Sequence, residues 1–286
     1  MTATIFAPIK INIALHVGPV RPDGYHPVDT LCVFPAIGDV LTYERDAPMG
    51  MDFAGPFAGP LADTPLRSNL VWRAFGALGI PPEGRFLLNK QVPVASGVGA
   101  GTADGVAAML LLNAVLDLGL DADDLVEASL DLGADGPVCM AGQIAGGGLW
   151  RAQGIGERVT RLGHVEPQAM LVVNPGIPVS TAQVFRLFDD HHQAPLRPIP
   201  AHRGHPLRAL LQSTENQLEH PARLLAPAIG DFLSALDQQP GAVATRMSGS
   251  GATCYALHTS SASAERAARV WRSQGLWAAA APVLAG

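Results

Sequence analysis

Two charged residues, Lys10 and Asp135, are of the types that phosphoryl transfer requires. Lys10 lies among isoleucines in the segment IKINIALHV, where a cation is costly unless it is paired or faces a polar cleft. Asp135 lies in the segment LGADGP. Phosphoryl transfer needs a carboxylate that accepts or orients a hydroxyl proton and cations that offset negative charge, so the two residues matter as a pair. Taken singly, Lys10 could be an edge lysine that reaches water, and Asp135 could be a turn or capping carboxylate.

A glycine-rich loop, SGVGAGTADG, has the composition of a phosphate-binding loop. Gly97, Gly99 and Gly101 alternate with other small or apolar residues, and a helix is predicted to follow. Because glycine has no side chain, the backbone of such a loop can wrap around an anion and direct its N–H groups at it. The helix N-terminus adds partial positive charge at the same place. The Thr102 hydroxyl could contact a phosphate or its magnesium ion. Neither GxxxxGK[ST] nor GxGxxG spacing is present, and a packing role stays open for this loop alone.

A second glycine loop occurs in the segment RMSGSGATCYAL, between two stretches that resemble strands. Gly and Ser are ordinary hairpin residues, so Ser248 to Gly251 could form a simple turn. The alternative is that the backbone N–H groups around Gly249 and Ser250 form a nest near a second phosphate.

The elements that must position these residues follow from hydrophobic periodicity. Strict alternation over residues 9–17 predicts a strand whose polar face carries Lys10 and Asn12. Further strands are expected near residues 28–36, 39–45 and 85–91, helices over 69–78, 103–116 and 121–132, and a loop over 46–65. The segment LGADGPVCMAGQIAGGGLW predicts a turn followed by a glycine-rich strand. In the second half we expect a strand from residue 169, a helix near 180–188, a Pro/His-rich loop over 190–206, helices within 207–237, strands at 243–248 and 253–257, a helix over 261–273 and a last strand.

Composition bounds the classes of protein and partner. The chain has 286 residues, 48% of them hydrophobic, which suits one large domain or two modest ones, and the pattern of elements is α+β. A change of composition near residues 163–168 predicts an N-terminal domain of residues 1–163 and a C-terminal domain of residues 164–286. The net charge of −6 and the absence of Lys/Arg clusters argue against a nucleic-acid surface. Only two of the nineteen basic residues are lysines, Lys10 and Lys90, so Lys90 also merits attention.

The remaining sequence features favour a cytoplasmic location. The three cysteines have no disulfide or metal-ligand spacing and read as reduced thiols. No export signal and no apolar run of membrane-spanning length are found. The histidines, among them His191, His192, His202 and His205, lack metal-site spacing and read as surface residues. No apolar stripe marks an oligomer interface.

Three segments at these relative positions resemble the GHMP kinases, a superfamily that includes galactokinase, homoserine kinase and the mevalonate kinases. APIKINIALHVGPVRPDGYHPVDTL, LGADGPVCMAGQIAGGGLWRAQGIGERV and RMSGSGATCYAL are most similar to the members that act on 4-diphosphocytidyl-2-C-methyl-D-erythritol. The resemblance covers nearly the whole chain. It implies a GHMP kinase fold, with an N-terminal α/β sandwich domain, a ferredoxin-like C-terminal domain and the substrate in the cleft between them.

The resemblance also implies an activity and roles for individual residues. The activity is transfer of the ATP γ-phosphate to the 2-hydroxyl of the cytidyl substrate, a step of non-mevalonate isoprenoid precursor biosynthesis, with Mg²⁺ expected from the chemistry. Lys10 and Asp135 would be the catalytic pair. The cytosine would be held by Tyr25, His26 and Phe185, and the methylerythritol end by Asn12, with Gly249 and Ser250 also at the substrate. ATP would be bound by Asn69 and by the loop residues Pro93, Val94, Ala95, Ser96, Gly97, Val98, Gly99, Ala100, Gly101, Thr102 and Ala103.

The chain departs from the family pattern at a few positions. The family loop is usually richer in glycine and serine, whereas this chain has Ala100, Thr102 and Ala103. Thr102 keeps a hydroxyl and is therefore the candidate protein ligand for magnesium. Two alternatives stay open: a GHMP kinase for another small alcohol, such as homoserine or a sugar, and a nucleotide-binding relative without catalysis. The expected cytosine-binding residues Tyr25, His26 and Phe185 argue against a small aliphatic substrate, because such a substrate has no base for aromatic rings to hold.

Overall fold

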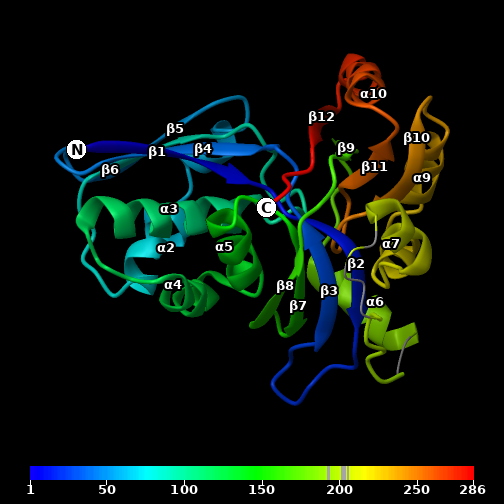
Figure 1. Ribbon diagram of the computed structural model, residues 1–286, viewed down its shortest axis with the longest axis horizontal. Helices are drawn as coiled ribbons and strands as arrows, with labels where there is room; N and C mark the ends of the chain where they lie inside the picture. Colours follow the sequence, from blue (N-terminus) through cyan, green and yellow to red (C-terminus); the bar gives the residue numbers. More distant parts are fainter. Residues whose placement is uncertain (192–193, 201–203, 205) are drawn as a thin grey trace.

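Three four-stranded sheets carry the described part of the computed structural model, which comprises residues 1–191, 194–200, 204 and 206–286 (Figure 1). The strands are Thr2–Pro8 (β1), Ile11–Val17 (β2), Val28–Val33 (β3), Gly38–Glu44 (β4), Gly50–Ala54 (β5), Arg85–Asn89 (β6), Leu149–Gly154 (β7), Arg158–Gly163 (β8), Ala169–Asn174 (β9), Ala242–Met247 (β10), Cys254–His258 (β11) and Trp277–Pro282 (β12). The helices are Gly59–Ala62 (α1), Leu70–Ala77 (α2), Ala100–Leu116 (α3), Ala122–Ala128 (α4), Gly136–Ile144 (α5), Thr181–His191 (α6), Leu207–Ser213 (α7), Glu219–Leu225 (α8), Ala228–Asp237 (α9) and Ser261–Ser273 (α10). Short 3-10 turns occur at Leu66–Ser68 and Ser129–Leu132.

The N-terminal lobe consists of the sheet β1-β4-β6-β5 and the helices α2 to α5. Its strands are antiparallel except for the parallel pair β5 and β6. Leu41, Phe75, Phe86 and Met109 are buried in one hydrophobic cluster that joins this sheet to α2 and α3. Burial of these large side chains fixes α3 against the sheet, and with it the loop that leads into the helix.

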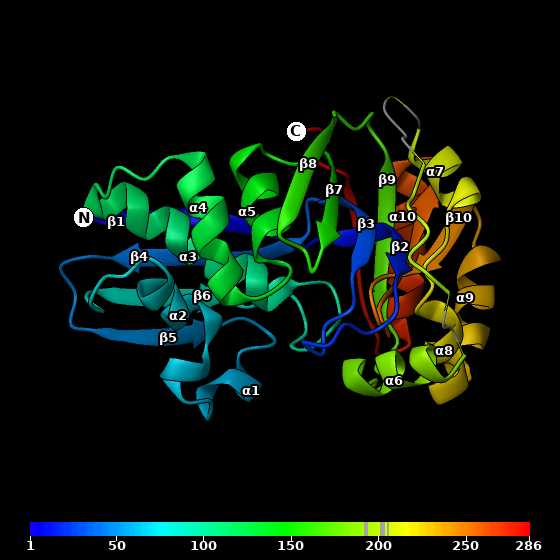
Figure 2. The same cartoon turned by 90° about the horizontal axis from the view of Figure 1, so that it is seen from below.

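A second sheet, β2-β3-β7-β8, lies between the N-terminal helices and the C-terminal sheet (Figure 2). One hydrophobic cluster joins Ile11 and Ile13 of β2 to Met170 of β9 and Tyr255 of β11. Since this core contains side chains from both halves of the chain, β2 is held against both lobes. The predicted division after residue 163 falls between β8 and β9 and stays a prediction.

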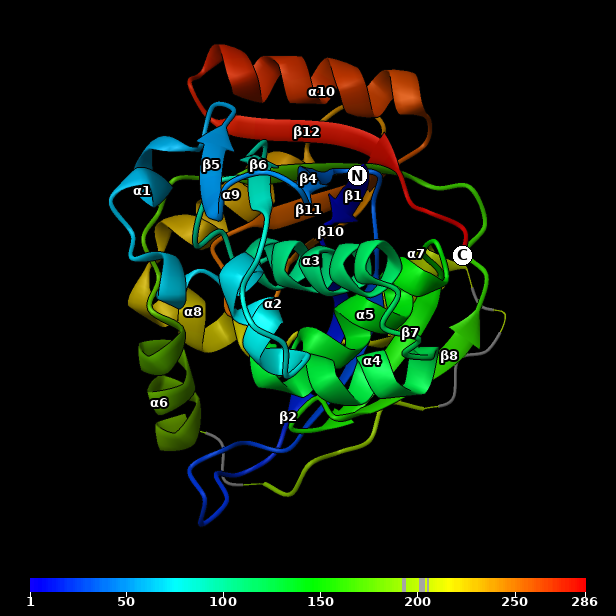
Figure 3. The same cartoon turned by 90° about the vertical axis from the view of Figure 1, so that its left-hand side faces the viewer.

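The C-terminal sheet has the strand order β10-β11-β9-β12. In chain order this is a strand, helices, two strands, a helix and a strand, which is the ferredoxin-like arrangement predicted. Helix α10 lies along β12 and β9 (Figure 3), and Trp271 of α10 is buried in the cluster that also holds Val173 and Ala256. The predicted α+β class is therefore confirmed.

The first predicted strand is wrong in detail. Residues 2–8 form their own strand, β1, and Ile9 and Lys10 make the crossing from one sheet to the next before β2 begins. The pairing of β2 with β3 shifts register between Asn12 and Ala14, so the strict alternation ends there. Lys10 and Asn12 precede this shift and, as predicted, lie on the same side as each other.

Two other elements differ from the sequence prediction. Residues 136–144 form helix α5, where a glycine-rich strand was expected. A Cβ on Gly142 would lie 2.2 Å from the Phe34 ring, and one on Gly136 would lie 1.9 Å from the Ser129 carbonyl oxygen, so these glycines permit close packing of a helix. The expected loop over residues 46–65 contains β5 and α1. Helix α3 begins at Ala100, three residues earlier than predicted, because Gly99 takes a left-handed conformation with φ of 66°.

Two further expectations from the sequence concern membrane-spanning helices and metal sites. No helix in its described residues has the length and apolar character needed to cross a bilayer. His192, His202 and His205 lie outside the described residues. Within the part that the structure describes, no group of three or more potential ligands among His, Cys, Asp and Glu could hold a metal ion.

Candidate active site

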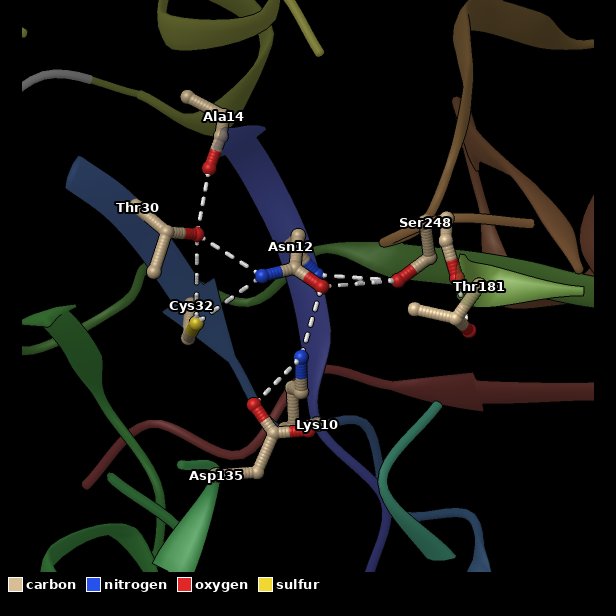
Figure 4. Close-up of polar contacts among 9 residues, drawn as sticks. Lys10, Asn12, Ala14, Thr30, Cys32, Asp135, Thr181 and Ser248 are labelled. Carbon is tan, nitrogen blue, oxygen red and sulfur yellow. Dashed lines mark hydrogen bonds and ion pairs between the residues drawn. The ribbon is translucent and has the colours of Figure 1, made fainter. Parts of the chain in front are cut away.

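Lys10 and Asp135 meet at the junction of the sheets. The Lys10 Nζ lies 3.0 Å from Asp135 Oδ1 and donates a hydrogen bond of 2.8 Å to Asn12 Oδ1 (Figure 4). The Asn12 Nδ2 donates in turn to Thr30 Oγ1 at 2.8 Å, and this second bond fixes the orientation of the amide. The predicted pair is thus brought together by the crossing from β1 to β2, which holds Lys10, and by the start of α5, which follows Asp135.

The electrostatics of the pair favour a permanent charge on the lysine. Burial has the largest single effect and lowers the pKa of Lys10, but the charge and hydrogen bond of Asp135, together with smaller effects of Cys32 and Cys139, leave the net pKa above its ordinary value. The Asp135 side chain is 41% exposed and makes no capping bond to α5, although Asp135 is the N-cap residue. Its carboxylate is therefore paired on one side with Lys10 and open to a cavity on the other. This rules out the capping interpretation for Asp135.

The glycine-rich loop forms a wall shared by two cavities. The larger cavity has a volume of about 700 Å³ and is lined by Lys10, Asn12 and Asp135 among others. The smaller cavity has a volume of about 320 Å³ and is lined by Asn69 and most of the loop. Three loop residues, Gly97, Gly99 and Thr102, line both cavities. Ligands in the two cavities would therefore meet across this loop, beside the Lys10–Asp135 pair.

The second glycine loop packs directly against the first. A Cβ on Gly97 would lie 2.3 Å from the Gly251 carbonyl oxygen, so the two backbones approach as closely as glycine allows. The Asn216 Nδ2 donates to the carbonyl oxygens of Met247 and Gly249 at 2.9 and 2.8 Å and holds the second loop in place. The loop is thus both the turn between β10 and β11 and part of the larger cavity, which Gly249 and Ser250 line.

The far end of the larger cavity is aromatic. His26 and Phe185 pack with ring centroids 4.8 Å apart, and the His26 Nδ1 lies 2.9 Å from the Gly18 carbonyl oxygen. Tyr25 also lines this cavity, but it is 57% exposed. Among the described residues, the Phe185 ring packs against the ring of His26 and not against that of Tyr25.

Comparison with known proteins places the chain in a family. Residues 69–143 match the family model for the GHMP kinases N terminal domain, and residues 199–275 match that for GHMP kinases C terminal. A 4-diphosphocytidyl-2-C-methyl-D-erythritol kinase of Granulibacter bethesdensis is 43% identical over 94% of this chain and 89% of its own length. The enzyme of the same name from Cereibacter sphaeroides is 41% identical over 96% of this chain and 97% of its own length. A crystal structure of 4-(cytidine 5'-diphospho)-2C-methyl-D-erythritol kinase superposes with a TM-score of 0.77, at 30% identity over 99% of this chain and all of that one. The chain belongs to the 4-diphosphocytidyl-2-C-methyl-D-erythritol kinase family of GHMP kinases.

As a GHMP kinase, the protein is an ATP-dependent kinase, and most of its predicted ATP-loop residues surround the smaller cavity. The exceptions are Val98 and Ala103, whose side chains are fully buried in hydrophobic clusters and line neither cavity. The Val98 carbonyl oxygen accepts a hydrogen bond of 3.1 Å from the Lys10 backbone N–H. These two side chains therefore anchor the loop to the core, and any contact of Val98 or Ala103 with ATP would come from the backbone, so their part in ATP binding stays a prediction.

Several residues of the larger cavity in this kinase were missed by the sequence analysis. Thr181, at the start of α6, lies 2.8 Å from Ser250 through the two hydroxyls. One face of α6 carries Ala182, Phe185 and Asp189, all of which line the cavity, and Asp189 Oδ2 lies 3.5 Å from His26 Nε2. The spacing of three and four residues from Phe185 was the available signal for this helix face.

A buried ion cluster of Lys90, Asp39 and Asp104 borders the smaller cavity of this kinase. The Lys90 Nζ lies 2.6 Å from Asp39 Oδ2 and 2.6 Å from Asp104 Oδ2, and all three side chains are nearly inaccessible to solvent. Burial raises the pKa of Asp104 to about 8, an effect that Asp39 reinforces and Lys90 opposes. We call this group the Lys90 cluster.

Asp104→Asn should change how thermal stability depends on pH. The folded protein holds the Asp104 proton up to about pH 8, whereas an unfolded aspartate releases it near pH 4. The folded state thus binds more protons between these values, and its stability falls as the pH rises through them. Asparagine has no such proton, so the Tm of the variant should gain on that of the unmodified protein as the pH is raised from about 5 to about 9. A Tm difference that stays constant over this range would contradict the assignment.

Proposed function

We propose that this kinase transfers the γ-phosphate of ATP to the 2-hydroxyl of 4-diphosphocytidyl-2-C-methyl-D-erythritol, in a step of non-mevalonate isoprenoid precursor biosynthesis. The observation that carries the proposal is the shared wall: Gly97, Gly99 and Thr102 line both cavities, and the Lys10–Asp135 pair lies at their junction. A donor and an acceptor bound on the two sides of the loop would be aligned there for transfer. Family membership supports the same activity.

The catalytic roles follow from the charges of the pair. Asp135 accepts the proton of the attacking hydroxyl as the new bond to the γ-phosphorus forms and the bond from that phosphorus to the bridging oxygen breaks, which releases ADP. The Lys10 ammonium offsets negative charge on the transferred phosphoryl group, and its raised pKa keeps it protonated. Asn12 orients the Lys10 ammonium and borders the methylerythritol end of the acceptor.

ATP binds in the smaller cavity, with its phosphates along the loop from Pro93 to Thr102 and its adenosine beside Asn69. Backbone N–H groups of the loop and the N-terminus of α3 provide the positive potential that a triphosphate needs in an acidic protein. Magnesium would bind mainly to phosphate oxygens and offset their charge, with the Thr102 hydroxyl as its protein ligand. Thr102 suits this role because it lines both cavities.

The cytidine end lies in the aromatic part of the larger cavity. His26 packs beside Phe185, and Tyr25 borders the same space, so the cytosine would stack on an aromatic surface and bond to the His26 edge. Gly249 and Ser250 would contact the acceptor near the diphosphate. A volume of about 700 Å³ suits a ligand of this size better than it suits homoserine.

Incubation with ATP, Mg²⁺ and a panel of alcohols tests the proposal by measured ADP release. The panel comprises the cytidyl substrate, homoserine and galactose. We expect turnover only with the cytidyl substrate. Activity on homoserine or galactose alone would overturn the proposed specificity, and binding of ATP without turnover of any alcohol would favour a nucleotide-binding relative without catalysis.

Phe185→Ala provides a matched check of the cytidine end. Removal of one stacked aromatic ring should raise the KM for the cytidyl substrate by about tenfold, because base–aromatic stacking contributes roughly 1–3 kcal/mol. The KM for ATP should not change, since Phe185 lines only the larger cavity. Equal changes in both KM values would point to a general loss of structure.

A further inference from the structure

The Lys90 cluster joins both ends of the ATP loop. Lys90 follows β6 directly, and the loop begins three residues later at Pro93. Asp39, in β4, accepts hydrogen bonds from the backbone N–H groups of Gln91 and Val92 through Oδ1, at 2.5 and 3.0 Å. Through Oδ2 it accepts from Lys90 Nζ, which also reaches Asp104 in α3, just beyond the other end of the loop.

The loop needs such constraints because its backbone is intrinsically mobile. Gly97 and Gly99 have positive φ values of 76° and 66°, and Ala95 also has a positive φ, of 56°. Glycine-rich segments lose much conformational entropy when they are fixed in one geometry. On the side of the reaction centre, the Lys10 N–H and the Thr253 hydroxyl bind the carbonyl oxygens of Val98 and Ser96. The Lys90 cluster is the corresponding attachment at the ends of the loop.

Stability alone gives a poor account of this cluster. One ammonium and two carboxyl groups are buried together, and such groups are often no more stabilising than apolar residues of similar size. Asp104 Oδ1 has no hydrogen-bond partner among the described residues, so the arrangement is incompletely satisfied. A costly cluster at this position is explained if it orients the loop.

We propose that Lys90, held by Asp39 and Asp104, is a positioning residue that fixes the ATP loop in its nucleotide-binding geometry. Lys90 is not a catalytic residue, because it lies outside the cavity that holds Lys10 and Asp135. The inference rests on the proposed function only in that ATP is the ligand of the loop. It predicts that loss of the cluster weakens ATP binding more than it weakens binding of the acceptor.

The test compares Asp104→Asn and the double variant Lys90→Met/Asp104→Asn with the unmodified protein. Affinity is measured with a non-hydrolysable ATP analogue and Mg²⁺, without turnover, alongside the Tm and the KM for the cytidyl substrate. Small displacements of positioning groups can change function by factors of about ten to a hundred, so the double variant should bind the analogue at least about tenfold more weakly. Its KM for the cytidyl substrate should change less than its affinity for the analogue, because the loop forms only one wall of the larger cavity.

Arg151→Met is the matched control for loss of a buried ion pair. Arg151 binds the buried Asp29 with two hydrogen bonds, of 2.8 and 2.5 Å, and does not line the ATP-loop cavity. We expect a lower Tm and an unchanged affinity for the analogue. If the double variant behaves in the same way, Lys90 is merely structural and the inference is wrong.

Asp104→Asn covers the case in which the double variant does not fold. Asparagine has nearly the same shape and can still accept a hydrogen bond from Lys90, so this variant should remain folded. At about pH 9, above the pKa of Asp104, the variant lacks the carboxylate charge and should lose analogue affinity several-fold. Unchanged affinity of a folded Asp104→Asn protein at that pH would also overturn the inference. Because no measurement of analogue binding needs an acceptor, these results are independent of whether the cytidyl substrate is phosphorylated.

Discussion

Asp135→Asn should lower kcat by about 10²- to 10⁴-fold, the range for loss of a positioned general base. An amide cannot accept the hydroxyl proton, so the loss falls on the chemical step. The KM values for ATP and for the cytidyl substrate should change little, because the amide oxygen of the substituted side chain could still accept a hydrogen bond from Lys10. The fold should persist, since the Asp135 side chain is partly exposed and makes no capping bond.

Asp131→Asn is the control for this prediction. It makes the same chemical change four residues earlier, at an exposed position that lines neither cavity. Steady-state rates of ADP release for the two variants, with circular dichroism to confirm folding, give the comparison. If Asp135→Asn keeps more than about a tenth of the kcat, Asp135 is not the base of this reaction.

The reaction centre could be predicted because its residues carry local signals. Lys10 and Asn12 are two apart within an alternating segment, which puts their side chains on the same side of the chain. The glycines of the ATP loop and the helix that follows them indicate a phosphate-binding loop. Lys10 and Asp135 are 125 positions apart in the sequence, and no pattern within either segment predicts that they meet. That expectation came from the resemblance to a family.

The elements that were missed illustrate the limits of local patterns. The glycines of the segment LGADGPVCMAGQIAGGGLW suggested a glycine-rich strand, yet two of them, Gly136 and Gly142, lie in α5 and make room for the Ser129 carbonyl and the Phe34 ring. Such contacts depend on residues that pack from elsewhere in the chain, so tertiary packing overrides the local preference against glycine in helices. The stop in the alternation at Asn12 and Ala14 has a similar origin, because it arises from pairing with β3.

The Lys90 cluster shows the same limit for a site. The scarcity of lysine marked Lys90 as unusual, but its partners, Asp39 and Asp104, lie 51 and 14 residues away in sequence. Only the folded chain brings these charges together at the ends of the loop. Asp104 fell within the helix predicted over residues 103–116, and nothing in that pattern pointed to Lys90.

Lys10→Met should lower kcat by about 10²- to 10³-fold, the usual loss when one group that stabilises transition-state charge is removed. Methionine nearly matches the length of the lysine side chain, and its apolar side chain can pack against the buried isoleucines nearby. The partly exposed Asp135 is not left as a fully buried charge, and Asn12 Oδ1 keeps a possible donor in the Ser248 hydroxyl at 3.4 Å. The variant should therefore fold, and its loss should appear in turnover.

The double variant Lys10→Met/Asp135→Asn tests whether the two residues act as one unit. Groups that work together in a single transition state show strongly non-additive losses. We therefore expect the double variant to be little slower than the worse of the two single variants, as measured by single-turnover formation of ADP. Fully multiplicative losses would mean that Lys10 and Asp135 act independently, and that their contact of 3.0 Å has no part in the reaction.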